Sequence, residues 1–212
     1  NVGVMYFLGQ GVPQDKAEAF KWYKLAAEQG IALAQFNVGV MYFLGQGVPQ
    51  DKAEAVKWYK LAAEQGLPEA QFSVAIRYLE GEGVPQDETE AVKWCTLAAG
   101  QGHPQAQLNV AIAYSTGKGV PQDKAEGFKW YKLAAEQGHP QAQFNVGAGY
   151  FNGEGVPEDL VYAYVWLNLA AANGDNTIKK SRDAIKNILS PSQLERAQRL
   201  STECFKKNYK DC

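Results

Sequence analysis

The stretch Gly45-Gln46-Gly47-Val48-Pro49-Gln50-Asp51 decides how this chain folds, because its pattern returns along almost the whole sequence. Further Gly-x-Gly-Val-Pro-x-Asp copies begin at Gly9, Gly81, Gly117 and Gly153. The copies lie 36 residues apart, and all five tryptophans, from Trp22 to Trp166, keep the same spacing. A fixed period between about 20 and 50 residues indicates a repeat array, in which each unit buries its apolar face against its neighbours.

The residues that follow each loop predict an amphipathic helix, which we call the B helix of the repeat. In residues 52–65 the apolar positions recur at i, i+3, i+4, i+7 and i+8, with charged residues on the other face. These apolar positions are Ala55, Trp58, Tyr59, Ala62 and Ala63. Asp51 with Glu54 three residues later is a capping pair for the start of this helix, and Gly66 supplies a left-handed stop.

A second helix, the A helix, is predicted from Pro68 to about Gly81, because proline suits the first turn of a helix. A helices carry two apolar stripes. In the second repeat one stripe is Ala34, Val38 and Tyr42, and the other is Phe36, Val40 and Phe43. One stripe must meet the B helix, and the other either packs against a neighbouring A helix or lines the inner surface of the array. The loop glycines and proline permit a tight reversal, so the sequence predicts stacked antiparallel hairpins.

The repeat pattern decays after Gly153, which predicts a C-terminal cap. Residues 175–189 are expected to form a helix, and Ser190 with Gln193 forms a capping box that opens a polar helix through about Lys206. We therefore expect a repeat array over residues 1–174, with units near 1–33, 34–67, 68–103, 104–139 and 140–174, and capping helices and a tail over residues 175–212.

The charge pattern argues against two classes of partner. The 21 basic and 23 acidic residues interleave and give a net charge of -2, without the basic stripe of a nucleic-acid binder or a polybasic membrane patch. The sequence contains no run of 18 apolar residues, so it predicts no membrane span. Residue 1 is equivalent to Asn37, so the sequence begins within a repeat, and any targeting segment upstream is out of view.

The repeated pattern resembles a known family, the Sel-one-like repeat (SLR) of bacterial proteins, a relative of the tetratricopeptide repeat. The residues that carry the resemblance are Ala34, Val38, Gly39, Tyr42, Gly45, Gly47, Val48, Asp51, Ala55, Trp58, Tyr59, Ala62, Ala63 and Gly66, and it covers about residues 1–174. It implies an all-α, right-handed α/α superhelix of about five 36-residue hairpins with a concave A-helix face. It also implies a non-catalytic scaffold for a protein or peptide partner, and export to the periplasm or beyond, in host interaction and virulence, envelope processes or signalling. A cytoplasmic location is the alternative.

The ligand-facing positions of tetratricopeptide-type helices, carried over to this sequence, give an expected partner-binding surface on the concave face. Its residues are Phe36, Asn37, Val40, Phe43, Phe72, Ser73, Ile76, Leu79, Leu108, Asn109, Ile112, Phe144, Asn145 and Phe151. The apolar side chains would anchor a peptide and the amides would pair with its backbone. Substitution between repeats is greatest nearby, at two repeat positions. One is held by Met41, Arg77, Ala113 and Gly149, and the other by Leu44, Glu80, Thr116 and Asn152. A repeat position whose residue varies in this way faces either solvent or a specific partner.

Candidate catalytic and metal-binding groups are few. Ser115 and Lys118 match the Ser-x-x-Lys of penicillin-recognising enzymes, but there the serine opens a helix, whereas Ser115 closes one. His103 and His139 are repeat equivalents in separate loops and are expected to face solvent, so we predict no metal site and no cofactor. Two alternatives stay open: a β-lactam or cell-wall hydrolase, as suggested for cysteine-rich relatives, and a self-assembling structural protein. We expect a monomer, with end-to-end association as the alternative.

The cysteines fall into two groups. Cys95 takes a position held by tyrosine in other repeats and is expected to be a buried thiol. Cys204 and Cys212, eight residues apart, either form a disulfide that clips the C-terminal tail or stay as two thiols in a reducing compartment. The cysteine-rich relatives carry two cysteines in every repeat, and this chain does not.

Overall fold

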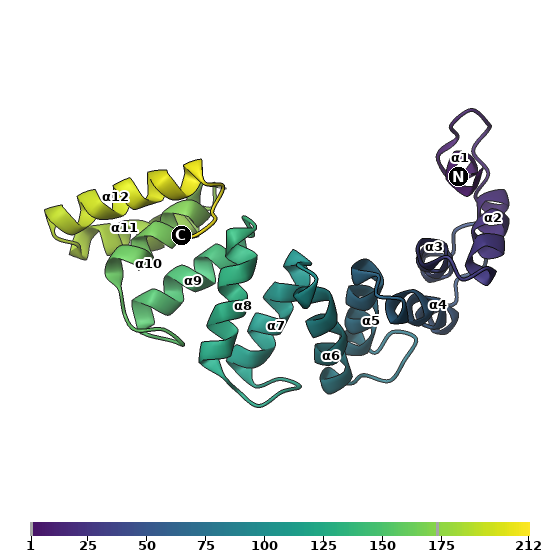
Figure 1. The fold of residues 1–212 in the computed structure, drawn as a ribbon, viewed down its shortest axis with the longest axis horizontal. Coiled ribbons are helices and arrows are strands. Elements are labelled where there is room, and N and C mark those ends of the chain that lie inside the picture. The colour runs from purple at the N-terminus through teal and green to yellow at the C-terminus, as the bar shows by residue number, and fades with distance from the viewer. Residues whose placement is uncertain (1, 173) are drawn as a thin grey trace. The chain divides into compact units, whose positions relative to one another are not determined.

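The computed structural model describes residues 2–172 and 174–212, and over these ranges the chain is helical with no strand (Figure 1). The helices are α1 (Val2–Leu8), α2 (Lys16–Glu28), α3 (Ala32–Leu44), α4 (Lys52–Glu64), α5 (Pro68–Glu80), α6 (Glu88–Gly100), α7 (Pro104–Thr116), α8 (Lys124–Glu136), α9 (Pro140–Asn152), α10 (Leu160–Ala171), α11 (Asn176–Ile188) and α12 (Pro191–Lys206). Two compact units divide the chain, unit 1 over Asn1–His103 and unit 2 over Pro104–Cys212. The predicted all-α class is confirmed.

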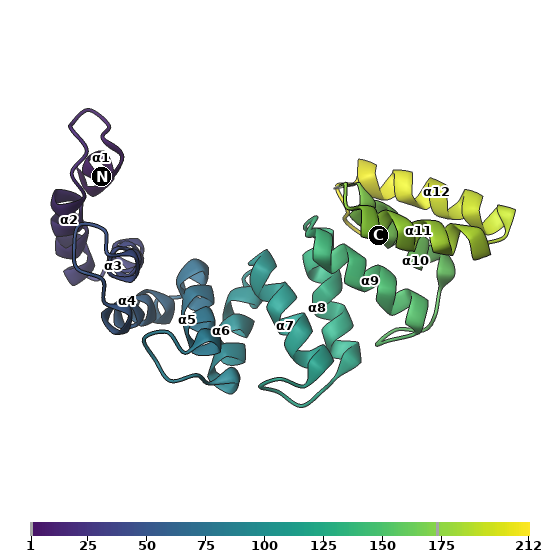
Figure 2. The ribbon, with the colours of Figure 1, turned by 180° about the vertical axis from the view of Figure 1, so that it is seen from behind.

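The hairpins follow the predicted order. The A helices are α1, α3, α5, α7 and α9, and each packs against the B helix that follows it, from α2 to α10 (Figures 1 and 2). The A helices α3, α5 and α9 end at a left-handed glycine, such as Gly45 with φ of 66°. The B helices stop before a left-handed glycine, such as Gly66 with φ of 89°.

The aspartate half of the predicted capping pair is present in four B helices, but the glutamate half has another role. The Glu54 backbone N–H donates to Asp51 Oδ1 at 2.9 Å, and the same bond opens α2, α6 and α8. The Glu54 carboxylate, however, accepts a hydrogen bond from Lys57 Nζ at 2.8 Å, and the Asp51 N–H donates to the Tyr42 carbonyl. The lysine one turn later competes for the carboxylate, so the pair is a simple N-cap beside an i,i+3 ion pair.

The second glycine of three loops is required by contact between neighbouring repeats within one unit. A Cβ atom on Gly47 would lie 2.1 Å from the Lys16 carbonyl oxygen, and one on Gly83 would lie 2.2 Å from that of Lys52. The loops at Gly47 and Gly83 in unit 1 therefore lie directly on the first turn of the preceding B helix, and so does the loop at Gly155 in unit 2, where a Cβ atom would lie 2.1 Å from the Lys124 carbonyl oxygen. Only glycine has both the positive φ and the missing side chain that this approach needs.

Buried glutamines join successive repeats, which the sequence did not reveal. In unit 1, Gln65 Nε2 donates to Gln35 Oε1 at 2.6 Å, and Gln35 Nε2 donates to the Ala27 carbonyl at 3.2 Å. One amide thus links α2, α3 and α4. Gln101 with Gln71, and in unit 2 Gln137 with Gln107, repeat the amide pair at 2.8 Å. Because a buried amide without partners costs free energy, these bonds fix the register of neighbouring repeats within each unit.

Burial along the tryptophan column is unequal. Trp22 is 41 % exposed, Trp58 and Trp94 are half-buried, and Trp166 is fully buried. The tryptophans, which share one repeat position, therefore do not share one environment. The most buried aromatic residues of the first two B helices are Tyr23 and Tyr59, at 5 % and 4 % exposed. They pack beside alanines and an A-helix glycine, because a Cβ atom on Gly39 would lie 2.6 Å from the Tyr59 ring.

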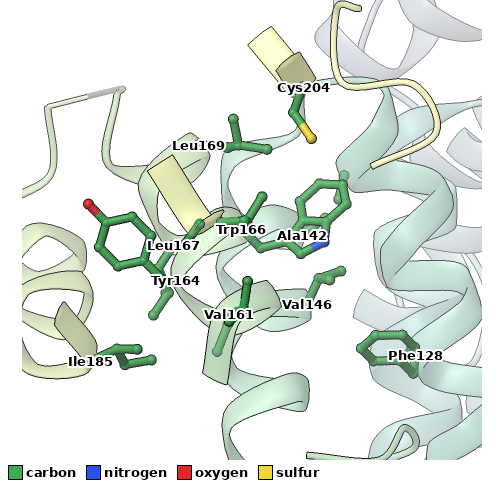
Figure 3. Close-up of a cluster of buried hydrophobic side chains, with 14 of the residues drawn as sticks. Phe128, Ala142, Val146, Val161, Tyr164, Trp166, Leu167, Leu169, Ile185 and Cys204 are labelled. Carbon is green, nitrogen blue, oxygen red and sulfur yellow. The ribbon is translucent and has the colours of Figure 1, made fainter. Parts of the chain in front are cut away.

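The C-terminal cap in unit 2 explains the burial of Trp166. Helices α11 and α12 both pack against α10, and Trp166 and Leu169 are completely covered there (Figure 3). The predicted capping box is confirmed, since Ser190 N–H donates to Gln193 Oε1 at 3.0 Å and Gln193 N–H donates to Ser190 Oγ at 3.3 Å. Both predicted cap helices are present, and they seal the apolar face of the last hairpin.

Candidate functional site

The second apolar stripe of the A helices has two roles in unit 1. Phe36, Val40 and Phe43 are half-buried and pack against the core formed with α4. The rings of Phe36 and Tyr59 lie 5.6 Å apart between centroids. The stripe therefore contributes to the contact between repeats and keeps part of its surface exposed.

The residues of the expected partner-binding surface differ in exposure between the units. In unit 1 every one of them is half-buried: Phe36, Asn37, Val40, Phe43, Phe72, Ser73, Ile76 and Leu79. In unit 2, Ile112 and Phe151 are 38 % and 44 % exposed, and Asn109, Phe144 and Asn145 are half-buried. Leu108 is only 5 % exposed and belongs to the core of unit 2, so it offers little surface to a partner.

An apolar groove lies in unit 2 between α9 and α11, with a volume of about 380 Å³; we call it the α9–α11 groove. Its lining residues are Phe144, Ala148, Phe151, Leu167, Ser181, Ala184, Ile185 and Ile188. Sequence reasoning named Phe144 and Phe151 but missed the wall from α11. The signal for that wall was the spacing of Ile178, Ile185 and Ile188 on an otherwise polar helix. The repeat and its cap form this groove together.

A smaller and more polar cavity of about 130 Å³ adjoins it, and we call it the Ser115 pocket. Its lining residues are Ser115, Lys124, Phe128, Tyr131, Asn145, Ala148, Gly149 and Glu154. Lys124 Nζ and Glu154 Oε1 pair across the pocket at 3.1 Å. Burial raises the pKa of the Tyr131 phenol, and its hydrogen bond with Ser115 acts in the opposite direction. Ala148 lines both cavities, so the two are neighbours.

The equivalent space in unit 1 is filled by side chains. The Arg77 guanidinium carbon lies 4.2 Å from the centroid of the Phe43 ring, and the guanidinium pairs with Glu82. Lys52 Nζ also pairs with Glu82, at 2.5 Å, and this hydrogen bond is the main reason that the pKa of Glu82 is lowered. An aromatic ring, a guanidinium and a carboxylate therefore form one layered cluster.

The two histidines are half-buried, so their expected exposure to solvent is wrong. The His103 ring stacks on Phe72 with centroids 4.6 Å apart, and His139 Nε2 lies 3.2 Å from Gln105 Oε1. Burial lowers the pKa of both imidazoles. Over residues 2–172 and 174–212 no three His, Cys, Asp or Glu side chains gather as a metal would require.

The other residues singled out from the sequence are Ser115, Lys118 and Cys95, and of these only Ser115 lines one of the two cavities. Ser115 is in the last turn of α7, and Lys118 is exposed in the loop beyond it. Cys95 is buried, as predicted, at 2 % exposed. Among the described helices none combines the length and the apolar character needed to cross a bilayer.

Cys204 and Cys212 are paired in the structure, with Cα atoms 5.6 Å apart, a separation typical of disulfides. The tail between them brings the Tyr209 ring to Gly138 at the end of α8, where a glycine Cβ atom would lie 3.0 Å from Tyr209 Cε2. The pair thus closes a short loop that packs the tail against the fourth repeat.

Replacing Cys204 and Cys212 together by serine is expected to lower the free energy of unfolding by about 2–3 kcal/mol, since the closed loop restricts the unfolded chain. Urea unfolding without reductant measures the change. As a control, reductant should destabilise the original chain equally and leave the double variant unchanged. If the oxidised, unfolded protein titrates with all three of its cysteines as thiols, the bridge does not form.

The fold defines a class, the α/α repeat proteins built from stacked helix hairpins. The Sel1 repeat profile matches residues 1–31, 32–67, 68–103, 104–139 and 140–175. The chain belongs to the Sel1 repeat family, so the resemblance inferred from the loop pattern is confirmed. Proteins of this family are generally non-catalytic scaffolds for protein–protein interaction.

Two solved structures are similar over nearly the whole chain. One is a protective antigen present in uropathogenic Escherichia coli strains with an SLR fold, at 37% identity and a TM-score of 0.86 over 95% of this chain and 44% of that one. The other is a Sel1 repeat protein from Oxalobacter formigenes, at 33% identity and a TM-score of 0.74 over 92% of this chain and 82% of that one. The present chain thus spans less than half of the E. coli antigen. No curated protein matches.

Proposed function

We propose that this chain binds a protein or peptide through the A-helix face, with the α9–α11 groove as the main anchoring site. The observation that carries the proposal is the groove itself, in which two predicted contact residues, Phe144 and Phe151, form a wall of an open apolar cavity of about 380 Å³. Concave apolar sites with a few polar groups nearby are where proteins take up apolar side chains.

The character of the groove favours a polypeptide over a small polar substrate. Its walls are aromatic and aliphatic, with Ser181 the only hydroxyl among the lining residues. Beside it, the half-buried Asn145 offers an amide that can pair with a peptide backbone. Aromatic anchors in desolvated pockets supply most of the affinity in such interfaces, and polar groups around them fix the register.

The cellular setting belongs to the same proposal. The E. coli structural relative is described as a protective antigen of uropathogenic strains, which supports an exported protein with a role in host interaction. A Cys204–Cys212 disulfide supports an oxidising compartment. Envelope processes and signalling are the other settings in which a binding scaffold of this kind serves.

Peptides selected from a random display library against the intact chain are expected to lose affinity by about tenfold or more in the double variant Phe144→Ala with Phe151→Ala, because two anchors are removed. Fluorescence anisotropy measures the dissociation constants. The control is Leu133→Ala, which removes from α8, outside the groove, an apolar side chain as exposed as that of Phe151.

Selected peptides that bind the double variant as tightly as the original chain would contradict the proposal, as would a library that yields no binder. Circular dichroism establishes that each variant keeps its helical content. Pairing Phe72→Ala with Phe144→Ala extends the test to both units, because these residues hold equivalent positions in α5 and α9.

A further inference from the structure

We propose that the Ser115 pocket binds an arginine side chain of the partner polypeptide. The inference rests on the proposed function for its partner, and it adds a second, charged contact beside the apolar groove. It comes from comparing the pocket with the equivalent space in unit 1, which the chain fills with its own residues.

Three side chains that fill this space in unit 1 are replaced by smaller ones in unit 2. Positions 72 residues apart are equivalent, so Phe43, Ile76 and Arg77 correspond to Ser115, Ala148 and Gly149. All three replacements line the pocket. The losses remove a ring, a branched aliphatic chain and a guanidinium from one region, which leaves a cavity of about 130 Å³.

The cavity is retained although two lining residues are larger, since Asn145 stands where unit 1 has Ser73 and Phe128 is also larger than its equivalent. Phe128 stands where unit 1 has Val56, and its ring packs against Gly149, where a Cβ atom would lie 2.8 Å from Phe128 Cδ2. Tyr131 is half-buried, whereas its equivalent Tyr59 is 4 % exposed. The pocket is therefore lined by two aromatic side chains and is not closed by them.

The charge of the pocket matches a cation. In unit 1, Glu82 pairs with both Lys52 and Arg77, and its side chain is 30% exposed. In unit 2, Glu154 keeps the lysine partner, Lys124, but no arginine stands at position 149, and the Glu154 side chain is 54% exposed. Since Glu82 holds two cations at once, Lys124 does not prevent a second cation from reaching Glu154.

Arginine fits this site better than lysine. A guanidinium is planar, is less strongly hydrated than an ammonium group, and stacks on aromatic faces while it donates to a carboxylate. Phe128 and Tyr131 supply rings, and Glu154 supplies the carboxylate. These are the chemical groups that Arg77 meets in unit 1, where it lies over Phe43 and pairs with Glu82.

The pocket also suggests the local sequence of the partner. Ala148 separates the Ser115 pocket from the α9–α11 groove and lines both. A partner segment that places a large apolar side chain in the groove can therefore place a nearby arginine in the pocket. Such a segment combines an apolar anchor with a charge that sets its register.

The test uses N-acetyl-arginine N′-methylamide as the probe and its neutral citrulline analogue as the control, followed by NMR of backbone amides in the intact chain. We expect saturable shifts at Ser115, Gly149 and Glu154 with the arginine probe, with a dissociation constant on the order of 1 mM. Glu82 serves as an internal reference, because its equivalent space is already filled. Equal shifts with citrulline, or shifts that never saturate, would overturn the inference.

Matched variants locate the effect. Glu154→Gln is expected to weaken arginine binding about tenfold, whereas Glu158→Gln removes the same charge from the same loop outside the pocket and leaves binding unchanged. The triple variant Ser115→Phe, Phe128→Val, Gly149→Arg installs the unit 1 residues at these three positions and should abolish binding. Undiminished binding in Glu154→Gln overturns the inference even if the triple variant fails to fold.

The result separates the two proposals. The arginine probe does not need the groove, so the variant Phe144→Ala with Phe151→Ala should still bind it. If selected peptides bind the groove and the arginine probe does not bind, the inference falls and the proposed function stands. If the probe binds and no peptide does, the proposed function falls while the pocket keeps its specificity for a guanidinium.

Discussion

Gly83→Ala is expected to lower the free energy of unfolding by about 3 kcal/mol or more, a large effect for the addition of one carbon atom. Gly83 has φ of 77°, and an added Cβ atom would lie 2.2 Å from the Lys52 carbonyl oxygen and 2.9 Å from the Ala53 nitrogen. Both are backbone atoms of the preceding repeat, so the clash is relieved only if the two repeats separate. Urea unfolding of the intact chain measures the change.

The matched control is Gly66→Ala in the same unit. Gly66 also has a positive φ, of 89°, but nothing lies within 4 Å of its added Cβ atom. This variant carries only the conformational cost of a left-handed alanine, about 1–2 kcal/mol. Equal destabilisation by the two substitutions would show that the glycine loop does not lie on the neighbouring repeat.

Leu169→Ala is expected to cost about 3 kcal/mol, whereas Leu133→Ala at the equivalent position one repeat earlier costs less than about 1 kcal/mol. Leu169 is completely buried, because the cap packs over α10, and Leu133 is 44 % exposed on α8. The same substitution thus leaves a cavity in one B helix and trims a surface side chain in the other. Thermal and urea unfolding of both variants check the difference.

The comparison of these two leucines tests the cap directly. A truncated chain that ends before α11 should remove the difference, since Leu169 would then be exposed as Leu133 is. If Leu133→Ala costs as much as Leu169→Ala in the intact chain, the cap does not provide the burial seen in the structure. Leu133, the control, and Leu169 are the same residue type at the same repeat position, and both lie in unit 2.

The candidate site was partly predictable. Helix-face periodicity and the family resemblance selected Phe144 and Phe151, and both line the α9–α11 groove. One of the two variable repeat positions is held by Arg77 and Gly149, and Gly149 lines the Ser115 pocket. The sequence did not predict that the three smaller residues Ser115, Ala148 and Gly149 line one cavity. These residues lie on two different A helices, α7 and α9.

The repeat period, the alternation of A and B helices, the aspartate caps and the capping box at Ser190 followed from the sequence alone. All of them depend on residues within a few positions of one another or on a strict 36-residue spacing. Helix starts and stops are local events, decided by hydrogen bonds within one turn and by the φ preference of glycine. Local rules therefore sufficed for the elements and their order.

Only the tertiary structure decided which equivalent residues are buried and which are exposed. Trp22 and Trp166 occupy the same repeat position, as do Leu133 and Leu169, yet in each pair the second alone is fully covered. The cause is packing between whole helices, since α11 and α12 cover α10 and no other B helix of unit 2 to the same extent. The burial of a residue depends on which elements pack against it. A periodic sequence places identical residues at equivalent positions, but different elements pack against them.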